Sequence, residues 1–345
     1  MRGFASAKLS GPGLSLVIAC ACTHPRTLTQ PSNSSPLPSL HQGPLTDYVP
    51  AAGLRWLLVG RPKTLAQNPE LVIEATRLLS KERLDAFATS SGVDLRTLPE
   101  GCIAGFDYGT LYLARTGTDS DLVRRRFEAR LVTDPIIRSS RKDMWRISGL
   151  ISNTPESLLT VEHDFAAFAV GDPVLARIAE AFAVGRFKKS KPALAGAALA
   201  TLPPDLSEAP LCFYAPGPFT DEWARAADGV LARALAIGAS ITLPGSSVLH
   251  VRVVMSGAFG PELEKTRVHL LDTWNNLQHS AVGHLLRLQE TMGPAMITVL
   301  DDSATLNVSF PVSTLVQGIC AAVIDDVATL MGDASSVRAH PANLK

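Results

Sequence analysis

Apolar residues alternate with polar ones, or form short unbroken runs, at ten places along the chain from Leu54 onward. Such patterns are typical of strands that bury one face or both. In the first half of this region we expect strands at 54–60, 102–106, 110–115, 145–151 and 157–171, the last of them bent. In the second half we expect them at 210–216, 239–243, 247–256, 296–300 and 304–310.

Helices are predicted between these strands, where a capping residue precedes apolar positions three or four residues apart. The expected ranges are 68–87, 118–130, 172–182, 220–238, 260–292 and 311–331. The pattern is clearest in 260–292, where seven apolar side chains share one helical face: Leu263, Leu270, Trp274, Leu277, Ala281, Leu285 and Leu288. An Ala-rich stretch within 188–206 also predicts a helix.

The order of these elements is β-α-β-β-α-β-β-α, and it occurs twice at similar offsets. We therefore expect an α+β fold made of two similar halves, 51–187 and 209–333, with a helical connector at 188–208 and a flexible tail at 334–345. Hairpins flanked by helices favour mixed or antiparallel sheets with helices packed on one face, rather than a doubly wound sheet. The alternative is that two α+β halves look alike by chance.

The N-terminus has the layout of a secretory signal peptide over 1–19. Arg2 and Lys8 precede a short apolar run at 14–19. The residues Val17-Ile18-Ala19-Cys20 resemble the lipobox of bacterial lipoproteins. That resemblance implies cleavage before Cys20, acylation of Cys20 (palmitate among the acyl chains), and an exported protein anchored in the bacterial cell envelope, at the periplasmic face of the outer membrane or at the cell surface. The alternatives are an ordinary secretory signal and a misassigned start codon.

Proline and serine dominate the residues that follow. Residues 20–50 show no apolar period, so we expect an extended tether behind the acylated cysteine. A Pro-rich recognition segment is the alternative. No later run reaches the roughly 18 apolar residues that a transmembrane helix needs, and none is predicted.

Composition restricts the function classes. The 345 residues are 46% hydrophobic and 19% charged, which excludes a disordered chain. The 32 basic and 32 acidic residues balance, which argues against a nucleic-acid partner. Basic residues nevertheless gather in two places. We expect solvated faces there, or contact with an anionic lipid or polysaccharide surface: Arg124, Arg125, Arg126, Arg130, Arg138, Arg141, Lys142 and Arg146, then Arg186, Lys188, Lys189 and Lys191.

Two polar clusters are candidate sites. Glu162-His163-Asp164 lies within a predicted strand, and His269 and Asp272 share a face of the 260–292 helix with Asn276 and His279. Each cluster is more typical of a surface than of a site. A cleft between the halves that joined Glu162 or His163 to His269 or Asp272 would form a binding or catalytic site. Phosphate-loop, dinucleotide, zinc-protease and serine-hydrolase motifs are absent, and we expect neither a metal nor a cofactor.

Three cysteines follow the tether. Cys102, Cys212 and Cys320 lie in apolar runs and are expected as small core residues. Because an exported location permits disulfides, a Cys102–Cys212 bond is the alternative. Their spacing does not match a zinc site.

These observations favour an exported lipoprotein that acts by binding or as an envelope-assembly scaffold, without catalysis. The order of elements resembles that of uncharacterised duplicated α+β extracytoplasmic proteins, a resemblance that implies no functional residue. The expected partner is the membrane, through the anchor, together with an envelope protein or an anionic surface. The alternatives are an envelope hydrolase and a binder of small molecules or lipid, each with its site in the cleft between the halves.

Overall fold

The computed structural model describes residues 39–331, except residues 78, 118, 189, 221–225 and 246. Strands of the first half are β1 Leu54–Gly60, β2 Gly101–Phe106, β3 Gly109–Arg115, β4 Ile136–Arg141, β5 Met144–Ile151, β6 Thr154–Val161 and β7 Phe165–Val170. Strands of the second half are β8 Leu211–Pro216, β9 Ala234–Thr242, β10 Val248–Gly257, β11 Met296–Val299 and β12 Ser303–Pro311.

Helices lie in the longer connections between these strands and after β12. The α-helices are α1 Pro62–Leu65, α2 Pro69–Ala75, α3 Lys81–Ser91, α4 Ser120–Glu128, α5 Pro173–Ala183, α7 Leu263–Gln278, α8 Ala281–Leu285 and α9 Val312–Met331. Short 3₁₀ helices are η1 Leu45–Tyr48, η2 Leu95–Thr97, η3 Ala193–Ala195, η4 Leu199–Thr201, η5 Pro204–Glu208, η6 Ala226–Arg233 and η7 Gly260–Glu262.

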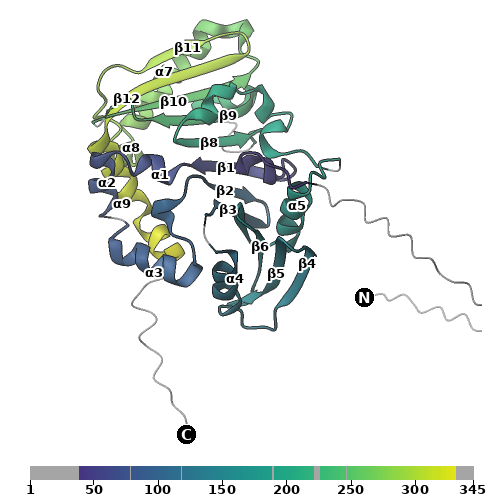
Figure 1. Cartoon of the computed structure of the whole chain (residues 1–345). Coiled ribbons are helices and arrows are strands. Elements are labelled where there is room, and N and C mark those ends of the chain that lie inside the picture. Colours follow the sequence, from purple (N-terminus) through teal and green to yellow (C-terminus); the bar gives the residue numbers. More distant parts are fainter. Residues whose placement is uncertain are drawn as a thin grey trace, which may run out of the picture. The chain divides into compact units, whose positions relative to one another are not determined.

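All twelve strands of the described chain form one antiparallel sheet, in the order β11-β12-β10-β9-β8-β1-β2-β3-β7-β6-β5-β4 (Figure 1). The α+β class is thereby confirmed. The halves meet where β1 pairs with β8. From that centre each half adds two sequential strands and then a hairpin in reversed order, and the first half adds β5 and β4 beyond it. This order is compatible with the predicted duplication, which stays a prediction.

Helices cover both faces of the sheet, so the expectation that they pack on one face is wrong. Leu159 of β6 packs in a core that includes α5 and η1, whereas its neighbour Leu158 packs in a core that includes α4. Because successive strand residues point to opposite faces, α5 and α4 lie on opposite sides of the sheet. In the second half, β10 and β12 form a third core with α9.

The connector does not form the predicted continuous helix. It consists of η3, η4, η5 and the residues between them. Four of its side chains are buried in the same core as residues of both halves: Ala193, Leu199, Leu202 and Leu206. The two halves therefore share one core across the β1–β8 junction.

Several predicted helices are shorter than expected. The range 68–87 contains α2, capped by Asn68, and α3, capped by Ser80. The range 260–292 contains η7, α7 and α8, because the Ser280 hydroxyl accepts a hydrogen bond from the Gly283 backbone N–H and starts a new helix. Of the predicted apolar face, Leu288 is buried and Trp274 packs partly buried against Phe310, whereas four residues are exposed: Leu263, Leu277, Ala281 and Leu285.

Two other elements differ in kind. The predicted bent strand 157–171 is the hairpin of β6 and β7, with Glu162, His163 and Asp164 in its turn and His163 at a φ of 60°. The predicted helix 220–238 ends at Arg233 in η6, and the remainder begins β9; its start at 221–225 lies outside the described residues.

The last part of the predicted tether belongs to the folded body. Leu45, Tyr48 and Val49 have no exposed surface and pack against α5 and the sheet. Pro50 forms a β-bridge with Pro192 of the connector. The expectation of an extended tether is therefore wrong for residues 39–50, and the signal peptide, Cys20 and the tail after 331 lie outside the described residues.

Candidate functional site

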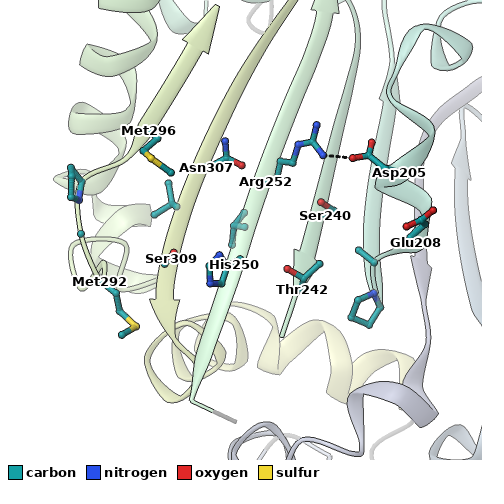
Figure 2. Close-up of a pocket in the computed structure, with 16 residues that line it drawn as sticks. Asp205, Glu208, Ser240, Thr242, His250, Arg252, Met292, Met296, Asn307 and Ser309 are labelled. Atoms are coloured by element: carbon teal, nitrogen blue, oxygen red, sulfur yellow. Dashed lines mark hydrogen bonds and ion pairs between the residues drawn. The ribbon is translucent and has the colours of Figure 1, made fainter. Parts of the chain in front are cut away.

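An open groove of about 600 Å³ lies on one face of the second half (Figure 2). Its floor consists of polar side chains from three adjacent strands. His250 of β10 lies between its cross-strand neighbours Thr242 of β9 and Ser309 of β12. A second row, one pleat further along, consists of Ser240, Arg252 and Asn307.

The alternation of strand residues explains why this floor is polar. Ile241, Leu249 and Phe310 occupy intervening positions and pack in the core beneath α9 on the opposite face. The polar partners therefore face away from that core. Ser240 and Thr242 of β9, and His250 and Arg252 of β10, alternate with apolar residues along these strands, as expected for a sheet with one solvated face.

The connector determines where the groove ends. Leu202 and Leu206 pack on the neighbouring part of the same face, in one core with Val254. The hydroxyls of Thr201 and Ser256 form a hydrogen bond there, with 2.5 Å between their oxygens. Beyond this contact the strand ends that carry Thr242 and His250 are exposed.

Two walls flank the floor, one from η5 and one from the segment that leads into β11. Asp205, Glu208, Ala209 and Pro210 form the first, and Met292, Gly293, Pro294 and Met296 form the second. The guanidinium of Arg61 donates hydrogen bonds to the carbonyls of Ser207, Glu208 and Ala209 at 2.6–2.8 Å. These bonds hold the first wall against β1.

The charges of the groove nearly balance. Arg252 Nη1 lies 2.6 Å from Asp205 Oδ2, as the dashed line in Figure 2 marks. Glu208 adds one negative charge, and His250 is the second basic group of the lining. Because the guanidinium is already paired, the groove favours a neutral polar ligand over an anion.

The lining provides hydrogen-bonding groups more than catalytic ones. His250 lies beside two hydroxyls, but within the described chain neither Thr242 nor Ser309 hydrogen-bonds its imidazole. Of the two carboxylates in the lining, that of Asp205 accepts a hydrogen bond from Arg252. A hydroxyl nucleophile needs a base within hydrogen-bond reach and a third group that orients the base, and the groove lacks that arrangement.

Within residues 39–331, apart from the gaps in that range, no group of three or more His, Cys, Asp or Glu side chains is arranged to hold a metal ion. In the same part of the chain, no helix combines the length and the hydrophobicity needed to cross a bilayer.

The predicted site residues do not line this groove. Glu162 and His163 lie in the β6–β7 turn, with His163 Nε2 3.4 Å from Glu162 Oε1, and the His163 side chain is 89% exposed. His269 and Asp272 belong to α7. The groove lies between the second half and the connector, so it is not the cleft between halves that the sequence suggested.

Asp164, the third member of the first cluster, has a structural contact. It forms an ion pair with Arg115 of β3 and lies 3.5 Å from the Tyr48 hydroxyl. The signal for the true groove residues was present in the sequence, since His250 and Arg252 alternate with valines in the run 248–254. What the sequence lacked was the register that places Thr242 and Ser309 on either side of His250.

The three cysteines in the described part of the chain form no disulfide: Cys102, Cys212 and Cys320 are free, so the Cys102–Cys212 alternative is wrong. Both Cys102 and Cys212 pair in register with Val59, on opposite sides of β1. Two strand spacings, about 9.5 Å, separate them, whereas a disulfide needs Cα atoms within roughly 7 Å.

We expect the two buried thiols to resist alkylation in the folded protein. Burial raises the pKa of Cys102 and of Cys212 above the usual thiol range, so little nucleophilic thiolate forms near pH 8. Iodoacetamide labelling, with peptides quantified by mass spectrometry, should modify both only after guanidinium unfolding, and the half-buried Cys320 should react at an intermediate rate. Equal labelling of Cys102 in folded and unfolded protein would contradict its burial.

Comparisons with known proteins found no matching family model and no matching curated protein. Two solved structures of TP0453 are similar in fold at low sequence identity. Crystal form III aligns with a TM-score of 0.47 and 11% identity, over 81% of this chain and 99% of that chain. Crystal form IV aligns with a TM-score of 0.44 and 10% identity, over 82% and 97%.

Proposed function

We propose that this protein is an exported, lipid-anchored binding protein that holds a neutral, extended polar ligand in the groove over β9, β10 and β12. The groove itself carries the proposal. Its volume of about 600 Å³ is in the usual range for ligand sites, and its floor presents hydroxyl, amide and imidazole groups in two rows. Methionine and proline side chains on one wall add apolar contact.

The charge of the groove supports this ligand class. An anionic lipid or polysaccharide would meet Asp205 and Glu208 on one wall, and Arg252 is already paired. A long apolar ligand would leave the five unpaired polar residues of the floor without partners, which costs free energy when they are dehydrated. A neutral peptide segment or a neutral sugar chain satisfies both conditions.

Substitution of Thr242 by Trp tests the groove. Thr242 is exposed, so the larger side chain should fold normally and fill the floor between His250 and the first wall. The purified wild-type protein, incubated with a cell-envelope extract and washed, should release a ligand on denaturation that mass spectrometry identifies. We expect Thr242→Trp to retain at least tenfold less of it.

The matched control is Thr89→Trp, at another exposed threonine, on α3. It should retain as much ligand as the wild type. Equal retention by Thr242→Trp would contradict binding in the groove. The same experiment separates a binder from the hydrolase alternative: the wild type and His250→Ala should release the same intact molecule, whereas cleaved product from the wild type alone would favour hydrolysis.

The lipobox resemblance supports the anchor, and Cys20→Ala tests it. Acylation at Cys20 with several chains, each contributing about 0.8 kcal/mol per buried CH₂, would hold the body at a membrane. We expect Cys20→Ala to appear unprocessed or in the soluble fraction, and Cys22→Ala to stay in the membrane fraction. Fractionation of Cys20→Ala like the wild type, or no incorporation of a labelled fatty acid at Cys20, would contradict the anchor.

A further inference from the structure

The strand β4 forms one edge of the twelve-stranded sheet and pairs with β5 alone. Its outer side therefore presents backbone N–H and C=O groups that no other strand of the described chain uses. Edge strands of this kind accept a further strand from another chain. The other edge strand, β11, has four residues against six in β4, and α7 packs on it.

The side chains of β4 are exposed on both faces. All residues from Val132 to Ser140 are exposed, and the exposed fractions of Ile136 and Ile137 are 60% and 48%. The strand is nevertheless held in place, because the Ser140 hydroxyl donates a hydrogen bond of 2.8 Å to Glu180 of α5. An ordered strand with apolar side chains in solvent is suited to association.

The charge beside this edge is strongly positive. Residues 124–146 contain eight basic and three acidic residues. Several of these bases are paired within the fold: Arg146 lies 2.7 Å from Glu180, and Arg141 lies 2.8 Å from Asp143. Arg138 lies opposite Arg146 in register and has no acidic partner in the described part of the chain.

We propose that β4 is a docking edge for an extended acidic segment of a partner protein, which adds to the sheet as a thirteenth strand. Arg138 and Ile136 face one side of the sheet, and Ile137 and Ser139 face the other. The fitting segment therefore alternates acidic residues, which would face Arg138, with apolar residues, which would face Ile137. The backbone groups of β4 supply affinity, and Arg138 supplies the charge preference.

A second copy of this chain fits the edge less well. Antiparallel pairing of two β4 strands would bring two sets of arginines together, and like charges across strands are destabilising. A membrane surface would contact the same arginines and isoleucines, but it would not form the regular hydrogen bonds that a further strand forms with the backbone groups of β4. A strand that alternates acidic and apolar residues satisfies the free backbone groups, the charge of Arg138 and the apolar side chain of Ile137 together.

Fluorescence anisotropy with short labelled peptides tests this proposal on the full chain. The probes are end-blocked Glu-Val-Glu-Val-Glu-Val, its Lys-Val counterpart, and two copies of the first that are N-methylated at alternate residues. We expect the Glu-Val peptide to bind at least tenfold more tightly than the Lys-Val peptide. At least one N-methylated copy should lose binding at least tenfold, because it removes the donors that face β4.

The Arg138→Glu variant should reverse the charge preference, whereas Lys63→Glu on α1, an equal change of net charge at another exposed site, should not. Circular dichroism melting of both variants checks that they fold. Equal binding of all N-methylated copies would overturn strand addition. An unchanged preference in Arg138→Glu, or binding to phosphatidylglycerol vesicles without any binding of the Glu-Val peptide, would overturn the proposed partner.

Discussion

Replacing Tyr48 by Ala should lower the free energy of unfolding by roughly 3–5 kcal/mol, the usual cost of deleting a large buried aromatic side chain. Tyr48 has no exposed surface. Its ring centroid lies 4.2 Å from that of Phe165 in β7, and its hydroxyl donates a hydrogen bond of 2.7 Å to the carbonyl of His41. The variant would leave a cavity where η1 meets α5 and the sheet.

Tyr108 provides the matched control. It lies in the turn between β2 and β3, and 86% of its surface is exposed. Tyr108→Ala should therefore change the guanidinium unfolding midpoint little, whereas Tyr48→Ala should lower it clearly. Equal midpoints for the two variants would show that residues 39–50 contribute nothing to the fold.

Because Tyr48 is buried, the free energy of unfolding depends on pH in the alkaline range. Dehydration, with Asp164 nearby, raises the pKa of Tyr48 to about 12 from an ordinary value near 10. The unfolded chain therefore loses this proton at lower pH than the folded protein does. The stabilisation that this raised pKa provides is present below pH 10 and is lost as the pH rises toward 12. Tyr48→Phe should lose less stability than the wild type between pH 10 and 12.

The predicted extended tether was wrong for residues 39–50, and the composition of this part of the chain explains why. Six prolines and many serines and threonines in 23–50 have the composition of a linker, and no apolar period marks Leu45 or Tyr48. Their burial depends on α5 and on the connector, which follow more than a hundred residues later. Local composition carries no information about such a long-range contact.

Local signals predicted much of the rest. Apolar patterns predicted the positions of β1, β2, β3, β8, β10 and β12. Asn68, Asp119 and Asp172 cap α2, α4 and α5, at or next to the first residues of the predicted ranges. Strand β4 was missed because it is exposed on both faces, so it has no apolar side to alternate with a polar one. The groove depends on the pairing of β10 with two strands distant in sequence, which periodicity within one strand cannot specify.

Arg115→Leu should also lower the free energy of unfolding strongly. It removes the cation from a partly buried cluster that holds residues 43–48 on the sheet. The Arg115 guanidinium pairs with Asp164 and with Glu100, the latter at 3.3 Å, and also donates a hydrogen bond to the Gly43 carbonyl. Only 20% of the Asp164 side chain and 13% of that of Glu100 are exposed. Removing one partner of such a pair leaves uncompensated charge and costs about 3 kcal/mol.

A double variant separates the charge from the packing. In Arg115→Leu with Asp164→Asn one of the two stranded carboxylates becomes neutral, so we expect this protein to regain part of the lost stability. Arg55→Leu is the matched control: Arg55 pairs with Asp107, but their side chains are 66% and 43% exposed, and such pairs contribute about 0–1 kcal/mol. The free energy of unfolding of each variant is measured with guanidinium. Two results would show that the cluster does not hold residues 43–48 on the sheet: an equally small loss in Arg115→Leu and Arg55→Leu, or a loss in the double variant larger than the sum of the losses in its two single variants.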